Sequence, residues 1–189
     1  MDALARLFCT PARLKLLRLF VFNDTASYTS REATFRAKIS VVAARKELAA
    51  LVAIGIIRRR GEGRRVKYGA NRHFPYFEAL TTFLRETTVV GPQEVLAVLR
   101  KAGTLRLVVL TGLFSGTVES KVDLLIVGDR LDERALASAV HTIEADIGRE
   151  IRYAMFSTED FRYRSGIYDR LLRDIFDYKH RVILDRIGI

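Results

Sequence analysis

Residues 40–68 read SVVAARKELAALVAIGIIRRRGEGRRVKY, a pattern that predicts a helix followed at once by a β-hairpin. Ser40 is a good N-cap for a helix over about 41–53, and Gly55 fits the cap at its C-terminal end. Apolar residues at helical spacing give this helix one inward stripe, which consists of Ala44, Leu48, Leu51 and Val52. The other faces of the helix are left for solvent or for a ligand.

The predicted hairpin over 56–68 combines a few apolar residues with a high density of positive charge. Gly61-Glu62-Gly63 suits the turn, and Ile57, Val66 and Tyr68 are expected to face a core. Six cationic residues flank the turn: Arg58, Arg59, Arg60, Arg64, Arg65 and Lys67. Such a ribbon beside a helix can straddle a phosphate backbone or enter a minor groove. The alternative is a solvated strand edge whose charges prevent aggregation.

Helices are also predicted before this segment. Thr10 is a suitable N-cap for a first helix with an apolar pattern at helical spacing. A short helix over about 30–37, with Phe35 available to pack inward, is joined to the helix over 41–53 by the turn at 38–40. Two helices joined by a tight turn form a helix-turn-helix. An apolar connector of helical spacing completes a first domain over 1–90.

The stretch from 29 to 71 resembles the winged-helix transcriptional regulators of the ArsR-like kind. The likeness is carried by Ser30-Arg31-Glu32, Ile39-Ser40, Leu48, Leu51, Gly55-Ile56-Ile57 and Lys67-Tyr68. It implies a winged helix that binds duplex DNA as a two-fold homodimer. Metal-sensing members of this family need clustered Cys, His and carboxylate ligands. One cysteine and three scattered histidines do not supply them, so neither a metal nor a cofactor is expected.

The positive charge of the chain lies entirely in its first half. Residues 1–88 contain 17 Lys and Arg against 7 Asp and Glu, whereas residues 89–189 contain 15 of each, so the first part carries the whole net charge of +10. A basic domain joined to a neutral one indicates a dedicated module for a polyanion.

The residues expected to contact DNA lie on the helix-turn-helix and on the hairpin. From the recognition helix these are Ser40, Val41, Arg45 and Lys46, with Arg31 and Lys38 as phosphate clamps. The six hairpin cations are expected to meet the backbone or the minor groove. An RNA target is less favoured, because recognition of single-stranded RNA usually depends on aromatic residues exposed on a sheet.

The second half, residues 91–189, alternates strands with helices and predicts a small α/β domain. Strands are expected at 105–111, 122–127, 151–156 and 181–184, and helices at 93–102, 132–147 and 161–177. With the first half, this makes a two-domain protein of the α+β and α/β classes.

Part of this second half resembles the minimal nucleotidyltransferases. The likeness is carried by Gly112-Leu113-Phe114-Ser115-Gly116 and by Ser120-Lys121-Val122-Asp123, where that family has a Gly-Ser turn and then Asp-x-Asp. Lys121 stands at the first metal-binding acid, and the strand at 151–156 has no third acid. One carboxylate of three cannot hold two metal ions, so the domain is not expected to be an enzyme.

Three roles for this domain remain open. Gly112, Ser115, Gly116, Lys121 and Asp123 could form a nucleotide or phosphate pocket. The domain could instead serve dimerisation or docking of a protein effector, with Lys121 and Asp123 as a surface pair. The third role is an active nucleotidyltransferase of the toxin–antitoxin type, targeted by a winged helix.

The sequence contains neither a membrane-length apolar run nor an export signal. Cys9 is the single cysteine, so no intramolecular disulfide is possible, as is typical of a reducing cytoplasm. Cys9 itself is expected to be a small buried residue on a helix. These features predict a cytoplasmic protein without a membrane partner.

Overall fold

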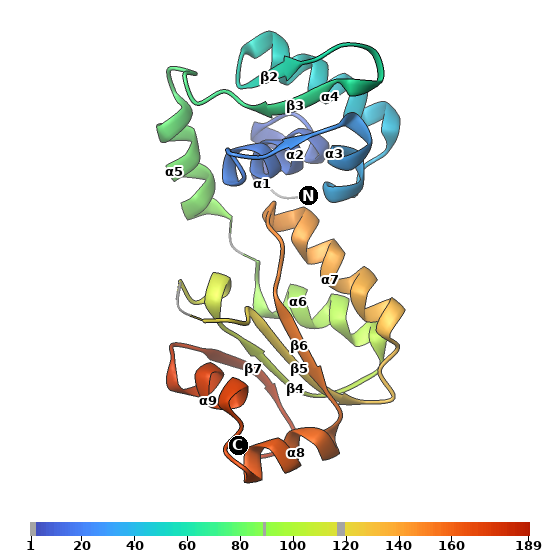
Figure 1. Ribbon diagram of the computed structural model, residues 1–189, viewed down its shortest axis with the longest axis vertical. Helices are drawn as coiled ribbons and strands as arrows, with labels where there is room; N and C mark the ends of the chain where they lie inside the picture. Colours follow the sequence, from blue (N-terminus) through green and yellow to red (C-terminus); the bar gives the residue numbers. More distant parts are fainter. Residues whose placement is uncertain (1–2, 89, 117–119) are drawn as a thin grey trace. The chain divides into compact units, whose positions relative to one another are not determined.

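The structure is a computed structural model that describes residues 3–88, 90–116 and 120–189, without the side chain of Arg64. It has mixed α+β secondary structure and divides into two compact units (Figure 1). The first unit consists of residues 1–90 and 141–149, and the second of residues 91–140 and 150–189. Residues 141–149, which the sequence analysis assigned to the second domain, thus group with the first unit. Among the described residues, no helix has the length and apolar character needed to cross a membrane.

The first unit contains a three-stranded antiparallel sheet in the order β1-β3-β2 and a set of helices. Its helices are α1 (Ala3–Leu7), α2 (Pro11–Phe22), α3 (Ser30–Arg36), α4 (Val41–Ile54) and α5 (Phe77–Thr87). Its strands are β1 (Ser27–Tyr28), β2 (Ile57–Arg60) and β3 (Lys67–Ala70), with a 3₁₀ turn at Gly63–Arg65.

Capping groups set the limits of these helices, as predicted. The Thr10 side chain accepts a hydrogen bond from the Arg13 backbone N–H at the start of α2, and Ser40 does the same for Ala43 at the start of α4. At the end of α4, Gly55 takes the left-handed conformation, with φ of 88°. The helix predicted over 41–53 is therefore confirmed with nearly the same bounds.

The core of the first unit forms around α2. This helix is buried on most of its circumference because Leu16 and Leu19 are buried in addition to the predicted apolar stripe. Ala33 packs into this core, but Phe35 is 69% exposed, so the prediction that Phe35 packs inward was wrong. Cys9 is exposed in the turn between α1 and α2 with φ of 70°, and its expected burial was also wrong.

The hairpin differs from its prediction in length and pairing. The strand expected at 64–68 begins only at Lys67, because a 3₁₀ turn at Gly63–Arg65 lengthens the connection. Val66 consequently lies outside the strand. On its other side, β3 pairs with the two-residue strand β1, which the sequence analysis did not predict.

The second unit is built on a four-stranded sheet in the order β6-β5-β4-β7. The strands are β4 (Thr104–Leu110), β5 (Leu124–Asp129), β6 (Tyr153–Phe156) and β7 (Arg181–Asp185). The helices are α6 (Pro92–Leu99), α8 (Thr158–Gly166) and α9 (Arg170–Asp177), with 3₁₀ turns at Arg100–Ala102 and Gly112–Phe114. A further helix, α7 (Glu133–Ile147), belongs to this unit up to residue 140 and to the first unit from residue 141. Strands β5 and β6 are parallel, and the other pairs are antiparallel.

Strand alternation gives the second sheet two apolar faces, and both are covered. Leu107, Val109, Leu125 and Val127 face α8 and α9, with Phe161, Leu172 and Ile175 packed against them. In Figure 1, α6 lies on the other side of the sheet from α8 and α9. The single helix predicted at 161–177 is wrong, because Tyr168 takes φ of 53° and Asp169 caps a new helix.

Candidate functional site

The solvent-exposed side of α4 presents apolar and charged side chains that are available for binding. Val42 is 78% exposed and Val41 is 54% exposed at the first turn of the helix, directly after the Ser40 cap. Arg45 and Lys46 follow on exposed positions one turn later. Apolar and cationic groups therefore share the exposed side of α4. An apolar side chain beside cations suits a groove with thymine methyl groups and phosphates.

The opposite face of α4 is held in place by a buried carboxylate. Glu47 is 2% exposed, and its two oxygens accept hydrogen bonds from the Thr10 hydroxyl at 2.9 Å and from the Arg13 guanidinium at 2.7 Å. Thr10 is also the cap of α2. Because these bonds cross between two helices, they fix the rotation of α4 about its own axis and hence which side chains it exposes.

The strand register separates the arginines of β2 onto two faces of the sheet. Side chains alternate along a strand, so Arg59 shares the face of the buried Ile57 and lies opposite Tyr68, whereas Arg58 and Arg60 point to the other face. The face with Ile57 packs on the helical core, α4 included, and is called the inner face below. The outer face carries Arg58 and Arg60 together with Lys67, which pairs with Arg60 across the strands.

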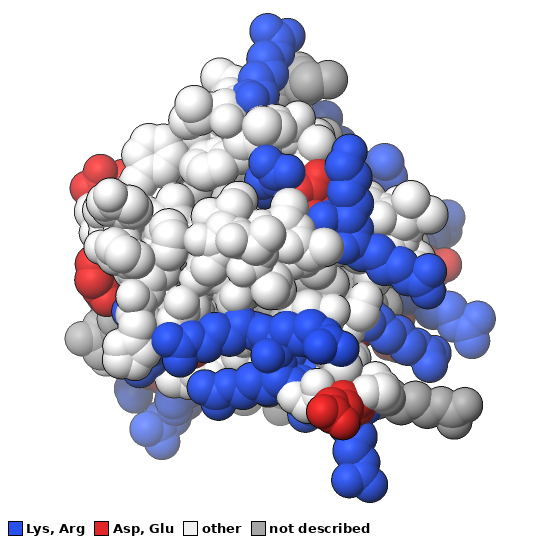
Figure 2. All heavy atoms as spheres, turned by 90° about the horizontal axis from the view of Figure 1, so that it is seen from above, with Lys and Arg blue, Asp and Glu red and all other residues white. Residues whose placement is uncertain are grey.

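Most cations of these surfaces have no carboxylate close to them among the described residues. In the described part of the chain, no ion pair within 4 Å involves Arg45, Lys46, Arg58, Arg59, Arg60, Arg65 or Lys67. Figure 2 views the molecule from the end that carries α4, β2 and β3. Lys and Arg side chains gather along two sides of this end around an uncharged centre, and acidic side chains are few. This end of the first unit is therefore electropositive.

The two residues predicted to act as phosphate clamps lie on α3 and on the turn between α3 and α4. Arg31 is exposed in the first turn of α3, next to a capping box in which Glu32 accepts hydrogen bonds from Thr29. Those bonds, the backbone one first, lower the pKa of Glu32 and keep it anionic. Lys38 is exposed in the turn between α3 and α4, where its backbone has φ of 50°. The side chain of Arg64 lies outside the described residues.

In the second unit, the carboxylate of Asp123 binds groups of the protein itself. Asp123 is 2% exposed. Its Oδ1 accepts from the Leu113 backbone N–H at 2.8 Å and from Arg152 Nη2 at 2.9 Å, and its Oδ2 accepts from Arg152 N at 2.9 Å and Nε at 3.0 Å. Burial raises the pKa of Asp123, but the hydrogen bonds from Arg152 and Leu113 outweigh it, so the net pKa is lowered. The carboxylate therefore clamps β5, the turn after β4 and the start of β6.

The other proposed pocket residues lie around this clamp. Gly112 is buried with φ of 48°, and a Cβ atom there would come within 2.2 Å of Asp123 Oδ1. Ser115 is half-buried, and Gly116 is exposed immediately before residues 117–119, which lie outside the described residues. Lys121 is exposed and forms an ion pair with Asp174 at 3.3 Å. The surface pair between Lys121 and Asp123 was thus a wrong prediction, since each has another partner.

Three residues of these sites were missed from the sequence. Val42 is more exposed than Val41, a difference that depends on how α4 is rotated in its packing. Glu47 was not singled out from the sequence, although its position one residue before the buried Leu48 could have indicated partial burial. Arg152 had no local signal, because its partner Asp123 is 29 positions away.

Comparisons with known proteins leave the site to be interpreted from its own geometry. The sequence matches no protein-family model, no curated protein and no solved structure. Within the described ranges, no group of three or more His, Cys, Asp or Glu side chains is arranged to hold a metal ion.

Proposed function

We propose that this protein is a cytoplasmic transcriptional regulator that binds duplex DNA through its first unit. In this proposal, α3 and α4 form a helix-turn-helix, β2 and β3 form the wing, and the first unit is a winged helix of the ArsR-like kind. The exposed side of α4 enters the major groove, where Val42 and Arg45 contact base edges. Lys46 and Arg31 meet phosphates, and so does Arg59 of the wing, which lies on the inner face of the sheet.

The observation that carries the proposal is the two-sided character of α4. Its inner side is locked by a buried carboxylate, while its outer side combines exposed valines with cations that have no ion-pair partner among the described residues. Single exposed valines are common on protein surfaces, but two of them beside Arg45 and Lys46 on one side of a helix make a mixed apolar and cationic surface. A positive surface of this kind favours phosphates through release of condensed counterions.

The proposal includes a two-fold homodimer and a second unit without catalytic activity. A dimer would read two half-sites about one DNA turn apart, roughly 34 Å. The second unit would supply dimerisation or docking, because its Asp123 carboxylate already accepts four hydrogen bonds and is committed to the fold. The experiment for this part is incubation with labelled ATP or GTP and Mg²⁺, for which we expect no transfer product.

The test of DNA binding is the dependence of affinity on salt. A duplex of about 30 bp, enriched by selection from a random pool, is titrated with the full chain over a range of salt concentrations, and binding is followed by fluorescence anisotropy. Each phosphate contact contributes about 0.9 to the slope of log K against log salt. We expect the double variant Lys46→Gln/Arg59→Gln to lose up to about 2 from this slope and to bind more weakly.

The matched control removes the same charge from the second unit. Arg162 in α8 and Arg170 in α9 are exposed, and neither forms an ion pair within the described part of the chain. The variant Arg162→Gln/Arg170→Gln should keep the slope of the natural protein. Equal losses in the two variants would show that net charge alone, and not the α4 surface, drives binding.

A further inference from the structure

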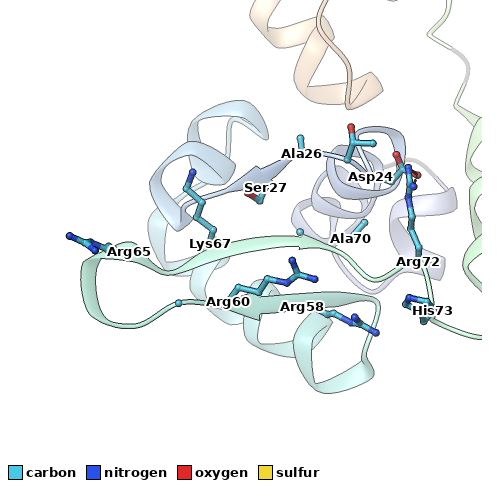
Figure 3. Close-up of a pocket in the computed structure, with 13 residues that line it drawn as sticks. Asp24, Ala26, Ser27, Arg58, Arg60, Arg65, Lys67, Ala70, Arg72 and His73 are labelled. Carbon is cyan, nitrogen blue, oxygen red and sulfur yellow. Dashed lines mark hydrogen bonds and ion pairs between the residues drawn. The ribbon is translucent and has the colours of Figure 1, made fainter.

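A cavity of about 630 Å³ lies over the outer face of the first sheet (Figure 3). Ser27 of β1 and Gly69 and Ala70 of β3 form its floor. Its cationic lining consists of Arg58, Arg60, Arg65, Lys67 and Arg72, together with the neighbouring His73. Asp24 is the one carboxylate of the lining. The cavity therefore has the size of a small-molecule site and a strongly positive wall.

Gly69 keeps the floor of this cavity open. It is paired with Ser27 on one side and with Arg58 on the other, so it lies at the centre of the sheet. A Cβ atom on Gly69 would approach the Ala26 carbonyl oxygen to 3.3 Å and the Ser27 Cβ to 3.6 Å. The missing side chain leaves a hollow between the cations of β2 and the strand β1.

The positive charge of the cavity is only slightly compensated. Asp24 is paired with Arg72, with contacts of 2.7 and 2.8 Å, and the hydrogen bond from Arg72 lowers the pKa of Asp24. Arg58, Arg60 and Lys67 have no ion pair within the described residues. Figure 3 shows the Arg60 side chain lying over the sheet beside Arg58, with Lys67 on the next strand and Arg65 pointing outward at the hairpin end.

This cavity is separate from the surface proposed for DNA. Arg58 and Arg60 leave the sheet on the side opposite to Ile57 and the helical core, whereas Arg59 leaves it on the inner side. A duplex lying along α4 therefore does not need the outer face. Several cations around one hollow match a compact anion with linked phosphate groups better than an isolated phosphate, because each linked phosphate meets its own cation.

We propose that the outer face of the sheet is a binding site for a small polyphosphate, either inorganic or carried by a nucleoside. The bound anion neutralises the positive field of the wing and weakens DNA binding. The site itself is independent of the proposed function, whereas this regulatory effect rests on it.

The experiment is a calorimetric titration of the full chain with sodium tripolyphosphate at about 0.15 M salt, with orthophosphate as the comparison anion. We expect tripolyphosphate to bind roughly tenfold more tightly than orthophosphate or better, and Arg58→Gln/Arg60→Gln to weaken it by a similar factor. Arg59→Gln removes one positive charge from the same strand but from the other face, and should change the affinity less than about twofold and less than the single variant Arg60→Gln does. An ATP arm without Mg²⁺ distinguishes the two sources of the phosphates.

The outcomes separate the cavity from the DNA surface. ATP binding comparable to that of tripolyphosphate assigns the site to nucleoside polyphosphates, and much weaker ATP binding assigns it to inorganic polyphosphate. Equal affinity for tripolyphosphate and orthophosphate, or an equal loss in Arg59→Gln, overturns the site. If tripolyphosphate binds as expected but no duplex binds, the proposed function fails while the site stands. If saturating tripolyphosphate leaves the DNA affinity unchanged, the regulatory effect is refuted.

Discussion

Replacement of Asp123 by Asn tests whether this residue is structural. The substitution keeps the shape but leaves one acceptor oxygen in place of two, so a pair of donors now faces an amide NH₂ group. Arg152 is 55% exposed and can turn its guanidinium to water, so its ion pair contributes little. A backbone N–H, that of Leu113 or Arg152, cannot move in the same way. One stranded buried donor costs about 1–3 kcal/mol, so we expect a loss of about 2 kcal/mol in the free energy of unfolding.

The pH dependence of the stability difference tests whether the charge of Asp123 causes it. The folded-state pKa of Asp123 lies below its ordinary value of 3.8, so its contribution to stability is present above that value and is lost as the pH falls through the folded-state pKa. The natural protein should therefore exceed Asp123→Asn in stability by a constant amount from neutral pH down to about pH 5. The difference should shrink below about pH 4, where the unfolded natural protein begins to bind the extra proton.

Urea unfolding followed by circular dichroism measures the difference, and hydrogen exchange of peptides from β4, β5 and β6 assigns it to the second unit. The control is Asp177→Asn, since Asp177 pairs with Arg173 at 3.9 Å where both side chains are more than half exposed, and it should matter much less. Equal stability of Asp123→Asn and the natural protein at neutral pH would refute the structural role. So would a stability difference that stays constant down to pH 2, because the carboxylate would then not be its cause.

Three further changes test other parts of the molecule. Val42→Asp should weaken DNA binding roughly tenfold or more by placing a negative charge in the interface, with little effect on melting temperature; unchanged anisotropy titrations would remove the start of α4 from the interface. Glu47→Ala should lower the free energy of unfolding by about 1–3 kcal/mol, because its two donors lose their acceptor, and Glu47→Gln should recover part of this in urea titrations. Gly112→Ala should lower the free energy of unfolding by about 2–4 kcal/mol, because its Cβ atom would clash with Asp123. Gly116 has φ of 73° and open space around it, so Gly116→Ala should lower the free energy of unfolding by only about 1 kcal/mol. Similar losses in both variants would rule out the close approach at Gly112.

Local signals in the sequence predicted much of the first unit. The limits of α4 follow from Ser40 and Gly55, because caps satisfy backbone groups of the helix ends through contacts only a few residues apart. The separation of charge between the two halves also needs no structure. The strands of the second unit were found for the same reason, since long runs of Val, Ile and Leu indicate buried strands.

The candidate sites depended more on contacts between distant residues. The hollow on the outer face needs β1, a two-residue strand that is too short to have a periodicity and forms only by pairing with β3. The 3₁₀ turn at Gly63–Arg65 shortens the second hairpin strand, so Arg65 projects from the turn and not from the sheet. No spacing rule predicts either result.

The sequence by itself determined where several helices begin and end and which half of the chain is basic. Only the tertiary structure decided which cations share a face, that Glu47 is buried and that Asp123 is held by Arg152. The physical reason is the separation along the chain between the interacting groups. Caps, periodicity and composition act over a few residues, whereas the energy of a buried carboxylate or of a strand pairing is set by groups that only folding brings together.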